Sequence, residues 1–262
     1  MRYNKRIVCI DDPISNNLAM GVGAQILKKQ NIDLKSLKKQ IIFRGVMSCK
    51  FLKNMVSLNK NFYYIDTGYL GNYKKKVWHR IIKNGFHMSQ ILEKPRGRLD
   101  ALNLERISWK KDGRSILICP ISKKSSIYYD VDPDKWLKDT ISIIRLHSDR
   151  PIVIREKSPI RRNRIRESSL FRALDNDIFC LVTYNSIAAV ESIYYGIPAF
   201  TLGENAACAV SSSDLSKIEY PVYPDREMWL RNIAYSQFTC EEMRNGTAIN
   251  ILKNTPWGDH EV

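Results

Sequence analysis

Short apolar runs rich in β-branched residues recur along the chain, and helix-like spacers separate most of them. This alternation predicts an α/β fold with mainly parallel sheets, because parallel neighbours need a long, usually helical crossover. The expected strands are Arg6–Ile10, Gln40–Arg44, Phe62–Ile65, Ser115–Cys119, Pro151–Arg155, Phe179–Thr183 and Ala199–Leu202. The expected helices are Asn17–Lys29, Lys74–Lys83, Asp134–His147, Ser186–Tyr195, Asp225–Ser236 and Cys240–Leu252.

The polar stretch Gly97–Gly113 lacks strong periodicity and is the expected domain boundary. On this division residues 1–110 form one Rossmann-like lobe. Residues 111–262 form a second Rossmann-like lobe that also carries the C-terminal helices. A chain of 262 residues is long enough to bury a core in each lobe.

The formal net charge of +15 is concentrated in the N-terminal half of the chain. Residues 28–98 contain 17 Lys/Arg against 3 Asp/Glu, whereas residues 175–262 contain 5 against 12. A basic surplus of this size suggests a polyanionic partner such as nucleic acid, phosphorylated sugars or an anionic membrane surface. Solvated lysines on helix faces are the alternative explanation.

Several classes of protein and site are disfavoured. The six cysteines are far apart and form no C-x-x-C pair, which argues against a structural zinc site and a secreted disulfide framework. No apolar run approaches the ~18 residues of a membrane-spanning helix, and a cytoplasmic location is expected. The acidic clusters Asp11-Asp12 and Asp130, Asp132, Asp134 are interpreted as turn residues, so no metal is expected.

The most informative segment is Phe179–Leu202, in which an apolar strand leads into a helix rich in small residues. Asn185 or Ser186 can cap the helix, and its free N–H groups suit a diphosphate. Glu191 is the conspicuous charged residue of that helix. An ordinary βαβ unit with a stray glutamate is the alternative.

Arg155 and Lys157 follow the strand Pro151–Ile154, at the carboxyl edge where α/β proteins bind ligands. Their positive charges could neutralise a departing diphosphate. A solvated loop would have the same composition.

In the N-terminal half, Asp66 is a lone carboxylate between an aromatic strand and a glycine-flanked turn. Surrounding cations would keep it ionised, and a positioned carboxylate can take a proton from an acceptor hydroxyl. Turn formation alone would also explain an aspartate at this point. Cations and aromatic rings follow, a mixture that suits phosphate backbones and unstacked bases. The candidate nucleic-acid contacts are Lys74, Lys75, Lys76, His79, Arg80, Lys83, Asn84 and His87.

The order of strand, small-residue helix start, glutamate and Gly-x-Pro resembles the donor-binding lobe of GT-B glycosyltransferases. The matching residues are Asn185, Ser186, Glu191, Gly196 and Pro198. The resemblance implies a compact GT-B fold in which Glu191 binds the ribose of a nucleotide-sugar and the helix start, with Thr183 before it, faces the diphosphate. It implies no cofactor besides the donor, which is expected to be a UDP-sugar.

Asp66-Thr67-Gly68-Tyr69, Arg80–Asn84 and the helix Trp229–Thr239 resemble bacteriophage proteins. The family suggested is that of the bacteriophage DNA-modifying glycosyltransferases, although its known members are longer. This resemblance implies sugar transfer to a hydroxymethyl-pyrimidine of DNA in the host cytoplasm, with Asp66 as the base. Two alternatives remain: a surface glycan or lipopolysaccharide as the acceptor, or a non-catalytic nucleic-acid-binding protein of the same fold.

Overall fold

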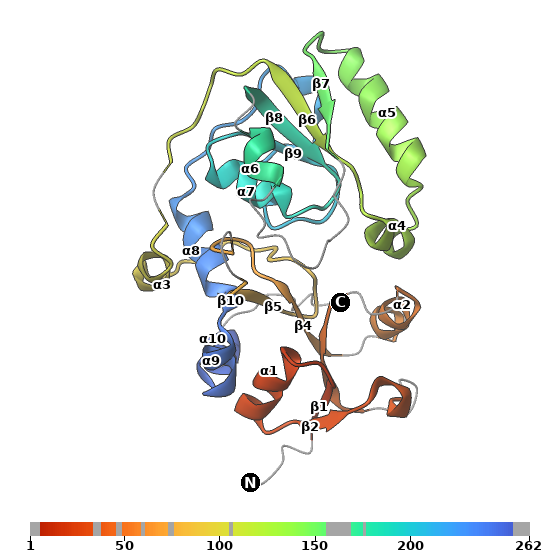
Figure 1. Cartoon of the computed structure of the whole chain (residues 1–262), viewed down its shortest axis with the longest axis vertical. Coiled ribbons are helices and arrows are strands. Elements are labelled where there is room, and N and C mark those ends of the chain that lie inside the picture. The colour runs from red at the N-terminus through yellow and green to blue at the C-terminus, as the bar shows by residue number, and fades with distance from the viewer. Residues whose placement is uncertain are drawn as a thin grey trace.

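The computed structural model describes residues 6–33, 38–45, 49–58, 61–72, 76–104, 107–155, 169–174 and 177–253. Three predicted site residues, Lys74, Lys75 and Lys157, lie outside these ranges. The described chain folds into two α/β lobes, one above the other in Figure 1, each built on its own sheet. The predicted fold class, α/β with two Rossmann-like lobes of mainly parallel strands and C-terminal helices, is confirmed.

The first sheet has six strands in the order β10-β5-β4-β3-β1-β2. Strands β1 to β4 are parallel neighbours, whereas β5 runs antiparallel to β4 and β10 runs antiparallel to β5. Helices α1, α9 and α10 pack on one face, and α2 contributes to the core of the other. The bounds are β1 Ile7–Ile10, α1 Ser15–Val22, β2 Gln25–Leu27, β3 Gln40–Arg44, α2 Cys49–Ser57, β4 Phe62–Thr67, β5 His79–Lys83 and α3 Gly97–Ala101, with a 3-10 turn at Lys29–Asn31.

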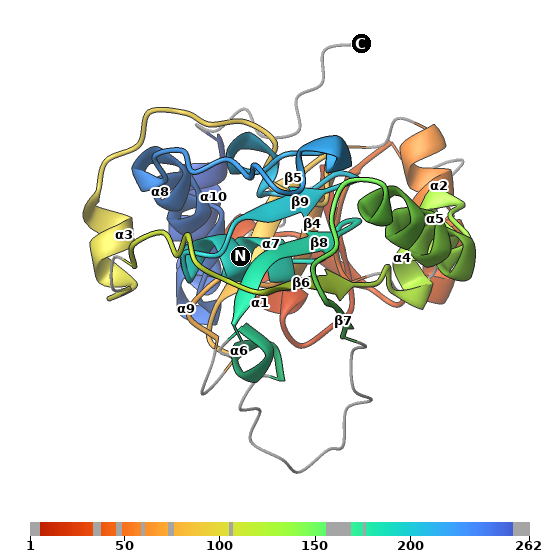
Figure 2. The same ribbon diagram turned by 90° about the horizontal axis from the view of Figure 1, so that it is seen from above.

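The second sheet is parallel throughout, in the order β7-β6-β8-β9. Helix α5 covers one face, and α6, α7 and α8 cover the other, so the central strands β6 and β8 are buried on both sides (Figure 2). The bounds are β6 Ser115–Cys119, α4 Lys123–Tyr129, α5 Pro133–Arg145, β7 Ile152–Ile154, α6 Ser169–Leu174, β8 Ile178–Thr183, α7 Ala188–Tyr194, β9 Ala199–Thr201 and α8 Glu227–Tyr235, with 3-10 turns at Cys208–Val210 and Leu215–Lys217.

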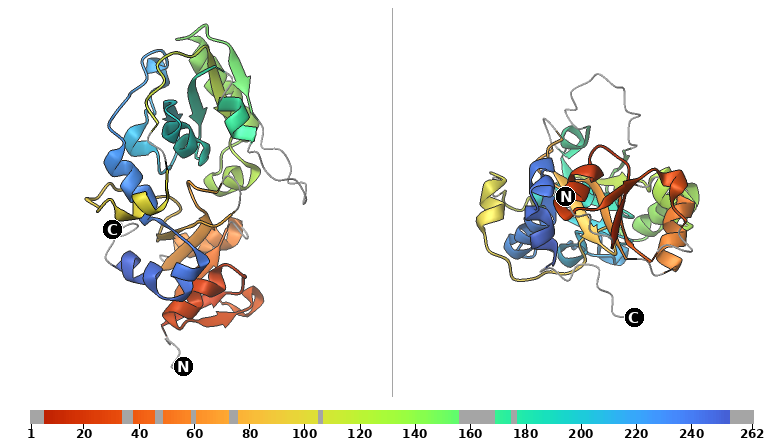
Figure 3. Two further views of the ribbon diagram at one scale, coloured as in Figure 1. Left: turned by 60° about the vertical axis from the view of Figure 1, so that its left-hand side comes forward. Right: turned by 90° about the horizontal axis from the view of Figure 1, so that it is seen from below.

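After α8 the chain returns to the first lobe as β10 Gln237–Phe238, α9 Cys240–Arg244 and α10 Thr247–Lys253 (Figure 3). The Gln237 side chain accepts hydrogen bonds from the amides of Tyr69, at 2.8 Å, and Leu70, at 3.1 Å. The two helices pack against α1. The sequence grouped these C-terminal helices with the second lobe, whereas the structure places them on the first sheet. Their apolar faces complete a core that α1 alone does not cover.

One predicted helix is wrong. Residues 79–83 of the expected helix Lys74–Lys83 form β5, which pairs with β4 from Tyr63↔Lys83 to Thr67↔His79. The partner strand decides the conformation here, because a short apolar run fits a strand or a helix equally well. Two other helices end early at glycines with positive φ, where a left-handed residue stops a helix: Gly23 after α1 and Gly246 between α9 and α10.

The return of the C-terminal helices predicts a measurable contribution to the stability of the first lobe. Met243 of α9 is fully buried against β1 and α1 residues, so Met243→Ala should lower the free energy of unfolding by about 2–4 kcal/mol. Met20 of α1 is 63% exposed, and Met20→Ala should change the free energy of unfolding by less than about 0.5 kcal/mol. Urea unfolding measures both. Equal effects of the two substitutions would contradict this packing.

Candidate functional site

Asp66 lies near the end of β4, directly opposite Arg80 of the antiparallel neighbour β5. Its Oδ2 accepts from the Tyr64 hydroxyl at 2.7 Å and from Arg80 Nη2 at 3.2 Å, and its Oδ1 accepts from the Thr67 amide at 2.7 Å. Tyr64 precedes it by two residues, so both side chains project from the same face of the strand. About a third of the Asp66 side chain, 34%, remains exposed. The result is a fixed carboxylate with a solvent-accessible part.

The surroundings of Asp66 favour its ionised form. Burial on its own would raise the carboxyl pKa, but Arg80, the Tyr64 hydroxyl, the Thr67 amide and Arg44 together lower it below the ordinary value. The carboxylate is therefore ionised at neutral pH, which is the state in which a general base acts.

Arg80 holds this arrangement in place. Its Nη1 donates to the Thr67 carbonyl at 2.8 Å, its Nε donates to the Phe86 carbonyl at 3.2 Å, and its guanidinium lies over the rings of Tyr64 and Tyr69 at 5.5 and 5.4 Å. Only 7% of the Arg80 side chain is exposed. A planar guanidinium bonded on three nitrogens fixes the Asp66 carboxylate in both position and charge.

The predicted nucleic-acid contacts do not form one exposed surface in the described part of the chain. His79, Arg80 and His87 are each buried, at 4%, 6% and 6% exposure, so they are not accessible to a DNA backbone in this conformation. Asn84 has a left-handed backbone, and its side chain accepts from the Phe62 amide and donates to Asn61. Lys83 is half-buried, and Lys76 is the exposed member of the described group. Most of these residues build the lobe, because β5 is an internal strand.

The two buried histidines predict acid lability. Burial, and then the positive charge of Arg44, lowers the pKa of His79 to about 4. Burial, and then the positive charge of Arg80, lowers the pKa of His87 to about 3. The unfolded chain takes up protons near pH 6.5 while the folded chain does not, so stability should fall as the pH drops from 6.5 towards 4. We expect a loss of about 2–5 kcal/mol between pH 7 and pH 4.5.

Urea unfolding at the two pH values measures this loss. His87→Gln should remove about half of the difference, whereas the exposed His147 provides a matched control, His147→Gln, that should leave it unchanged. A wild-type protein equally stable at both pH values would contradict the assignment of neutral buried imidazoles.

In the second lobe, the predicted donor residues cluster around the carboxyl ends of β6 and β8. Thr183 is fully buried, and its hydroxyl donates to the Cys119 carbonyl at 2.7 Å, so it joins the two strands. The thiol of Cys119 has a pKa raised by burial; Arg155 lowers that pKa and Glu191 raises it, which places both charged groups close to the end of β6. The structure thus brings Arg155 and Glu191 to the same strand end.

The helix start provides two further predicted residues with local partners. The Ser186 hydroxyl accepts from the Ala188 amide at 3.2 Å and so caps the first turn of α7. Burial and then Glu204 raise the pKa of the Tyr129 hydroxyl. Asn185 forms a hydrogen bond with the same hydroxyl, and this bond lowers the pKa by a smaller amount. Within α7, Glu191 is only partly buried, whereas its small and apolar neighbours are buried.

The site also contains residues that the sequence did not suggest. Tyr129 of α4 donates to Glu204, which follows β9, at 3.0 Å. Burial raises the pKa of Tyr69 to about 12, and Glu204 of one lobe and Asp66 of the other both contribute to that rise. Both carboxylates therefore act electrostatically on Tyr69. Glu204 lies two residues beyond the expected strand Ala199–Leu202. A carboxylate at the carboxyl end of a strand was the sequence signal that could have identified Glu204 as a site residue.

Aromatic contacts link the two lobes. Phe86 contacts Tyr64 at 5.0 Å and Tyr128 of α4 at 5.1 Å between ring centroids, and Tyr129 contacts both Tyr128 and Tyr184. An ion pair of 2.5 Å between Lys53 and Asp130 joins α2 to α4. These contacts hold the carboxyl ends of the two sheets near one another.

Each acidic cluster, interpreted from the sequence as turn residues, contributes one aspartate that accepts from amides at a helix start. Asp12 accepts from the amides of Ile14 and Ser15 at the start of α1, and Asp132 accepts from those of Asp134 and Lys135 at the start of α5. Among the described residues, no three His, Cys, Asp or Glu side chains are grouped so as to hold a metal ion. In the same part of the chain, no helix combines the length and apolar character needed to cross a bilayer.

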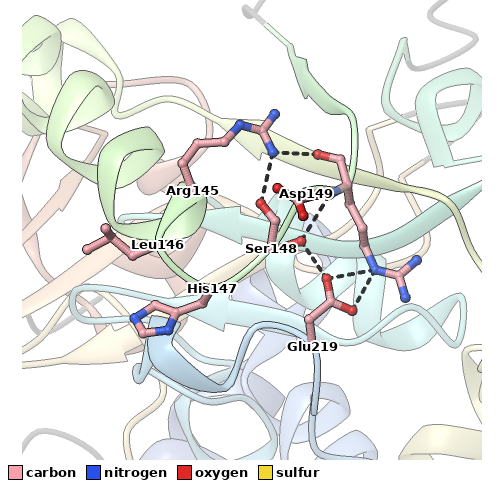
Figure 4. Close-up of a pocket in the computed structure, with 7 residues that line it drawn as sticks. Arg145, Leu146, His147, Ser148, Asp149 and Glu219 are labelled. Carbon is pink, nitrogen blue, oxygen red and sulfur yellow. Dashed lines mark hydrogen bonds and ion pairs between the residues drawn. The ribbon is translucent and has the colours of Figure 1, made fainter.

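A hollow of about 480 Å³ lies away from these residues, where α5 leads into β7 (Figure 4). Its polar groups bind each other: Arg150 Nε pairs with Glu219 at 2.9 Å, and the Ser148 hydroxyl donates to the same carboxylate. Arg145 donates to the carbonyls of Ser148 and Arg150. We assign this network to the fold, because it lies at the amino edge of the second sheet and because Arg150 and Glu219 neutralise each other.

Comparison with known proteins identifies relatives by structure. No protein-family model matches the chain, and no curated protein matches its sequence. Two solved domains of Thermosulfurimonas dismutans KpsC are similar in fold. The beta Kdo 2,4 transferase has a TM-score of 0.54 at 10% identity, over 90% of this chain and 93% of that chain. The beta Kdo 2,7 transferase has a TM-score of 0.55 at 11% identity, over 93% and 98%. The chain thus has the fold of these glycosyltransferases.

Proposed function

We propose that this protein is a glycosyltransferase that moves a sugar from a nucleotide-sugar donor to an acceptor hydroxyl, with Asp66 as the general base. The observation that carries the proposal is the geometry of Asp66: a partly exposed carboxylate at a strand end, kept ionised by a buried arginine. Such a group can take the proton of the attacking hydroxyl as the glycosidic bond forms. The shared fold with two sugar transferases supports the same reaction class.

The second lobe would bind the donor. Arg155 and Glu191 lie near the end of β6, and the start of α7 follows β8 at the same edge. In this arrangement Arg155 would stabilise the negative charge of the departing nucleoside diphosphate, and Glu191 would accept hydrogen bonds from the ribose hydroxyls. In this proposal the side chain of Arg155 supplies the positive charge at this edge.

For the acceptor we favour a glycan. Both similar structures are named as transferases of the sugar Kdo, and three of the residues predicted to contact DNA are buried. Transfer to a hydroxymethyl-pyrimidine of DNA remains the competing acceptor hypothesis, and the same assay distinguishes the two.

The test is a transfer assay with labelled nucleotide-sugars, including an activated Kdo. The acceptors are a panel of acidic and neutral oligosaccharides, plain DNA and hydroxymethyl-pyrimidine DNA. Label on an oligosaccharide would support the proposal. Label on modified DNA alone would identify the DNA acceptor and reject the glycan. No transfer and no donor hydrolysis with any pair would reject the enzyme.

The assignment of Glu191 predicts an effect on donor binding. Glu191→Gln should raise the KM for the nucleotide-sugar about tenfold and leave kcat within about threefold, because one hydrogen-bonded charge is lost far from the transferred atom. The exposed Glu241 of α9 offers a control, Glu241→Gln, that should leave both constants unchanged. An unchanged donor KM in Glu191→Gln would contradict the role.

A further inference from the structure

Glu204 lies in the loop after β9, and this loop runs alongside the loop after β8. The Gly203 amide donates to the Tyr184 carbonyl at 3.0 Å, and the Asn205 side chain donates to the Ser186 carbonyl at 2.9 Å. Gly203 has no room for a side chain, because a Cβ there would lie 2.7 Å from the Tyr184 ring. The bonds on both sides of Glu204 hold it beside the chain that enters α7, at the carboxyl edge where parallel sheets bind ligands.

A tyrosine hydroxyl also holds the Glu204 carboxylate. Tyr129 of α4 donates to Glu204 Oε2 at 3.0 Å, and the same hydroxyl forms a hydrogen bond with Asn185. The Tyr129 ring packs against the rings of Tyr128, at 4.8 Å between centroids, and Tyr184, at 5.4 Å. Glu204 therefore has a defined position beside Asn185, one of the predicted donor residues.

The Glu204 carboxylate still has unused acceptor capacity. The bond from Tyr129 is its one side-chain hydrogen bond within the described chain, and no cation of that part of the chain forms an ion pair with it. Glu204 is also exposed. A carboxylate without an ion pair would repel the phosphates of a nucleotide-sugar, whereas it accepts readily from hydroxyl groups. The part of a donor that suits Glu204 is therefore one that carries hydroxyls.

The helix that holds Glu204 also contacts the first lobe near Asp66. The ring of Tyr128 on α4 lies 5.1 Å from that of Phe86. Phe86 in turn lies 5.0 Å from Tyr64, whose hydroxyl donates to Asp66. The transferred sugar is the part of the donor that has to approach the first lobe, because the proposed base is there. Glu204 is thus held by the element that joins the donor edge to the surroundings of the base.

We infer that Glu204 accepts hydrogen bonds from hydroxyls of the transferred sugar and so determines which nucleotide-sugar the protein accepts. The inference rests on the proposed function, in which Glu191 binds the ribose and Arg155 the diphosphate, so that the sugar is the part of the donor left for Glu204. A site that bonds a hydroxyl discriminates against a sugar that lacks it, because the carboxylate would lose water without gaining a partner. Tyr129 is then a positioning residue.

The experiment is isothermal titration calorimetry of the full-length protein with UDP, UDP-glucose, GDP and GDP-mannose. In the wild type, we expect a nucleotide-sugar to bind more tightly than its free nucleotide. Glu204→Gln should weaken binding of that nucleotide-sugar about tenfold and binding of the free nucleotide less than about twofold, because the charge-assisted hydrogen bond is made to the sugar alone. Glu191→Gln should weaken binding of both, because both contain the ribose.

Tyr129→Phe keeps the ring contacts but removes the hydroxyl that positions Glu204. It should weaken binding of the nucleotide-sugar about threefold and of the nucleotide less than about twofold, since only the orientation of the carboxylate is lost. This variant also keeps the test valid if Glu204→Gln fails to fold. The exposed Glu241 supplies the control Glu241→Gln, which should bind all four probes as the wild type does.

Three results would overturn the inference and leave the donor lobe in place. They are equal wild-type affinities for nucleotide and nucleotide-sugar, equal losses for the two in Glu204→Gln, or no loss for either in that variant. If none of the four probes binds the wild type, the donor assignment of the proposed function fails, and this inference fails with it. Loss of nucleotide-sugar binding alone in Glu204→Gln, with Glu191→Gln weakening both, is the result expected.

Discussion

Replacing Asp66 with asparagine is expected to lower kcat for sugar transfer by a factor on the order of 10²–10⁴, the usual contribution of a general base. The amide keeps the size of the side chain, and its single oxygen can still accept from the Thr67 amide, so the turn at the end of β4 should persist. It cannot take a proton from the acceptor. Steady-state kinetics with the donor and acceptor found by the transfer assay measure the loss.

Binding of the donor separates this effect from misfolding. The donor residues lie in the other lobe, so the dissociation constant of the nucleotide-sugar should change by less than about threefold in Asp66→Asn. Asp139, 53% exposed on α5, gives the control Asp139→Asn, for which full activity is expected. If Asp66→Asn turns over normally, another group is the base, and Glu204 of the second lobe is then the next carboxylate to replace.

The second large effect concerns stability and comes from Arg80. Arg80→Leu should lower the free energy of unfolding by about 3 kcal/mol, because it leaves the Thr67 and Phe86 carbonyls and the Asp66 carboxylate without their buried donor. The partial exposure of Asp66 keeps the loss below that of a fully buried pair. Urea unfolding by circular dichroism measures the change.

Arg96 provides a comparison of the same residue type, with two ion pairs against the one of Arg80. It pairs with Asp100 and Glu227, but half of its side chain, 51%, is exposed. Arg96→Leu should therefore lower the free energy of unfolding much less than Arg80→Leu does. Similar losses for the two arginines would show that burial does not determine the contribution of Arg80. Arg80→Leu should also lower activity, since Asp66 loses its anchor.

The alternation of strands and helices was readable from the sequence because it follows from local preferences. The strand expected at Phe62–Ile65 and those of the second sheet are present, and they were apolar enough to be recognised without their neighbours. The segment His79–Lys83 was not recognised as a strand, because its two adjacent isoleucines fit either a helix or a strand. Pairing with β4 settles the conformation, and pairing is not a local property.

Some residues of the candidate site could likewise be predicted from the sequence, and others could not. The sequence singled out Asp66, Arg155 and Glu191 because a charged residue at the end of an apolar run is conspicuous. It did not suggest Tyr129 or Glu204, whose position depends on how α4 and the loop after β9 meet. It also grouped Arg80 and His87 with exposed cations, whereas the fold buries both.

The sequence by itself determined the class of fold, two units of parallel strands and helices, because burial of periodic apolar residues allows few other arrangements. It also determined where the charges lie along the chain. The tertiary structure alone decided which of those charges are available. Arg80 and Arg44 are both basic residues at strand ends, but Arg80 is enclosed by two aromatic rings and three acceptors, whereas 29% of the Arg44 side chain is exposed and its ion pair with Asp12 spans 3.5 Å. Solvent exposure and partners, which arise only when distant segments pack, separate the buried arginine from the partly exposed one.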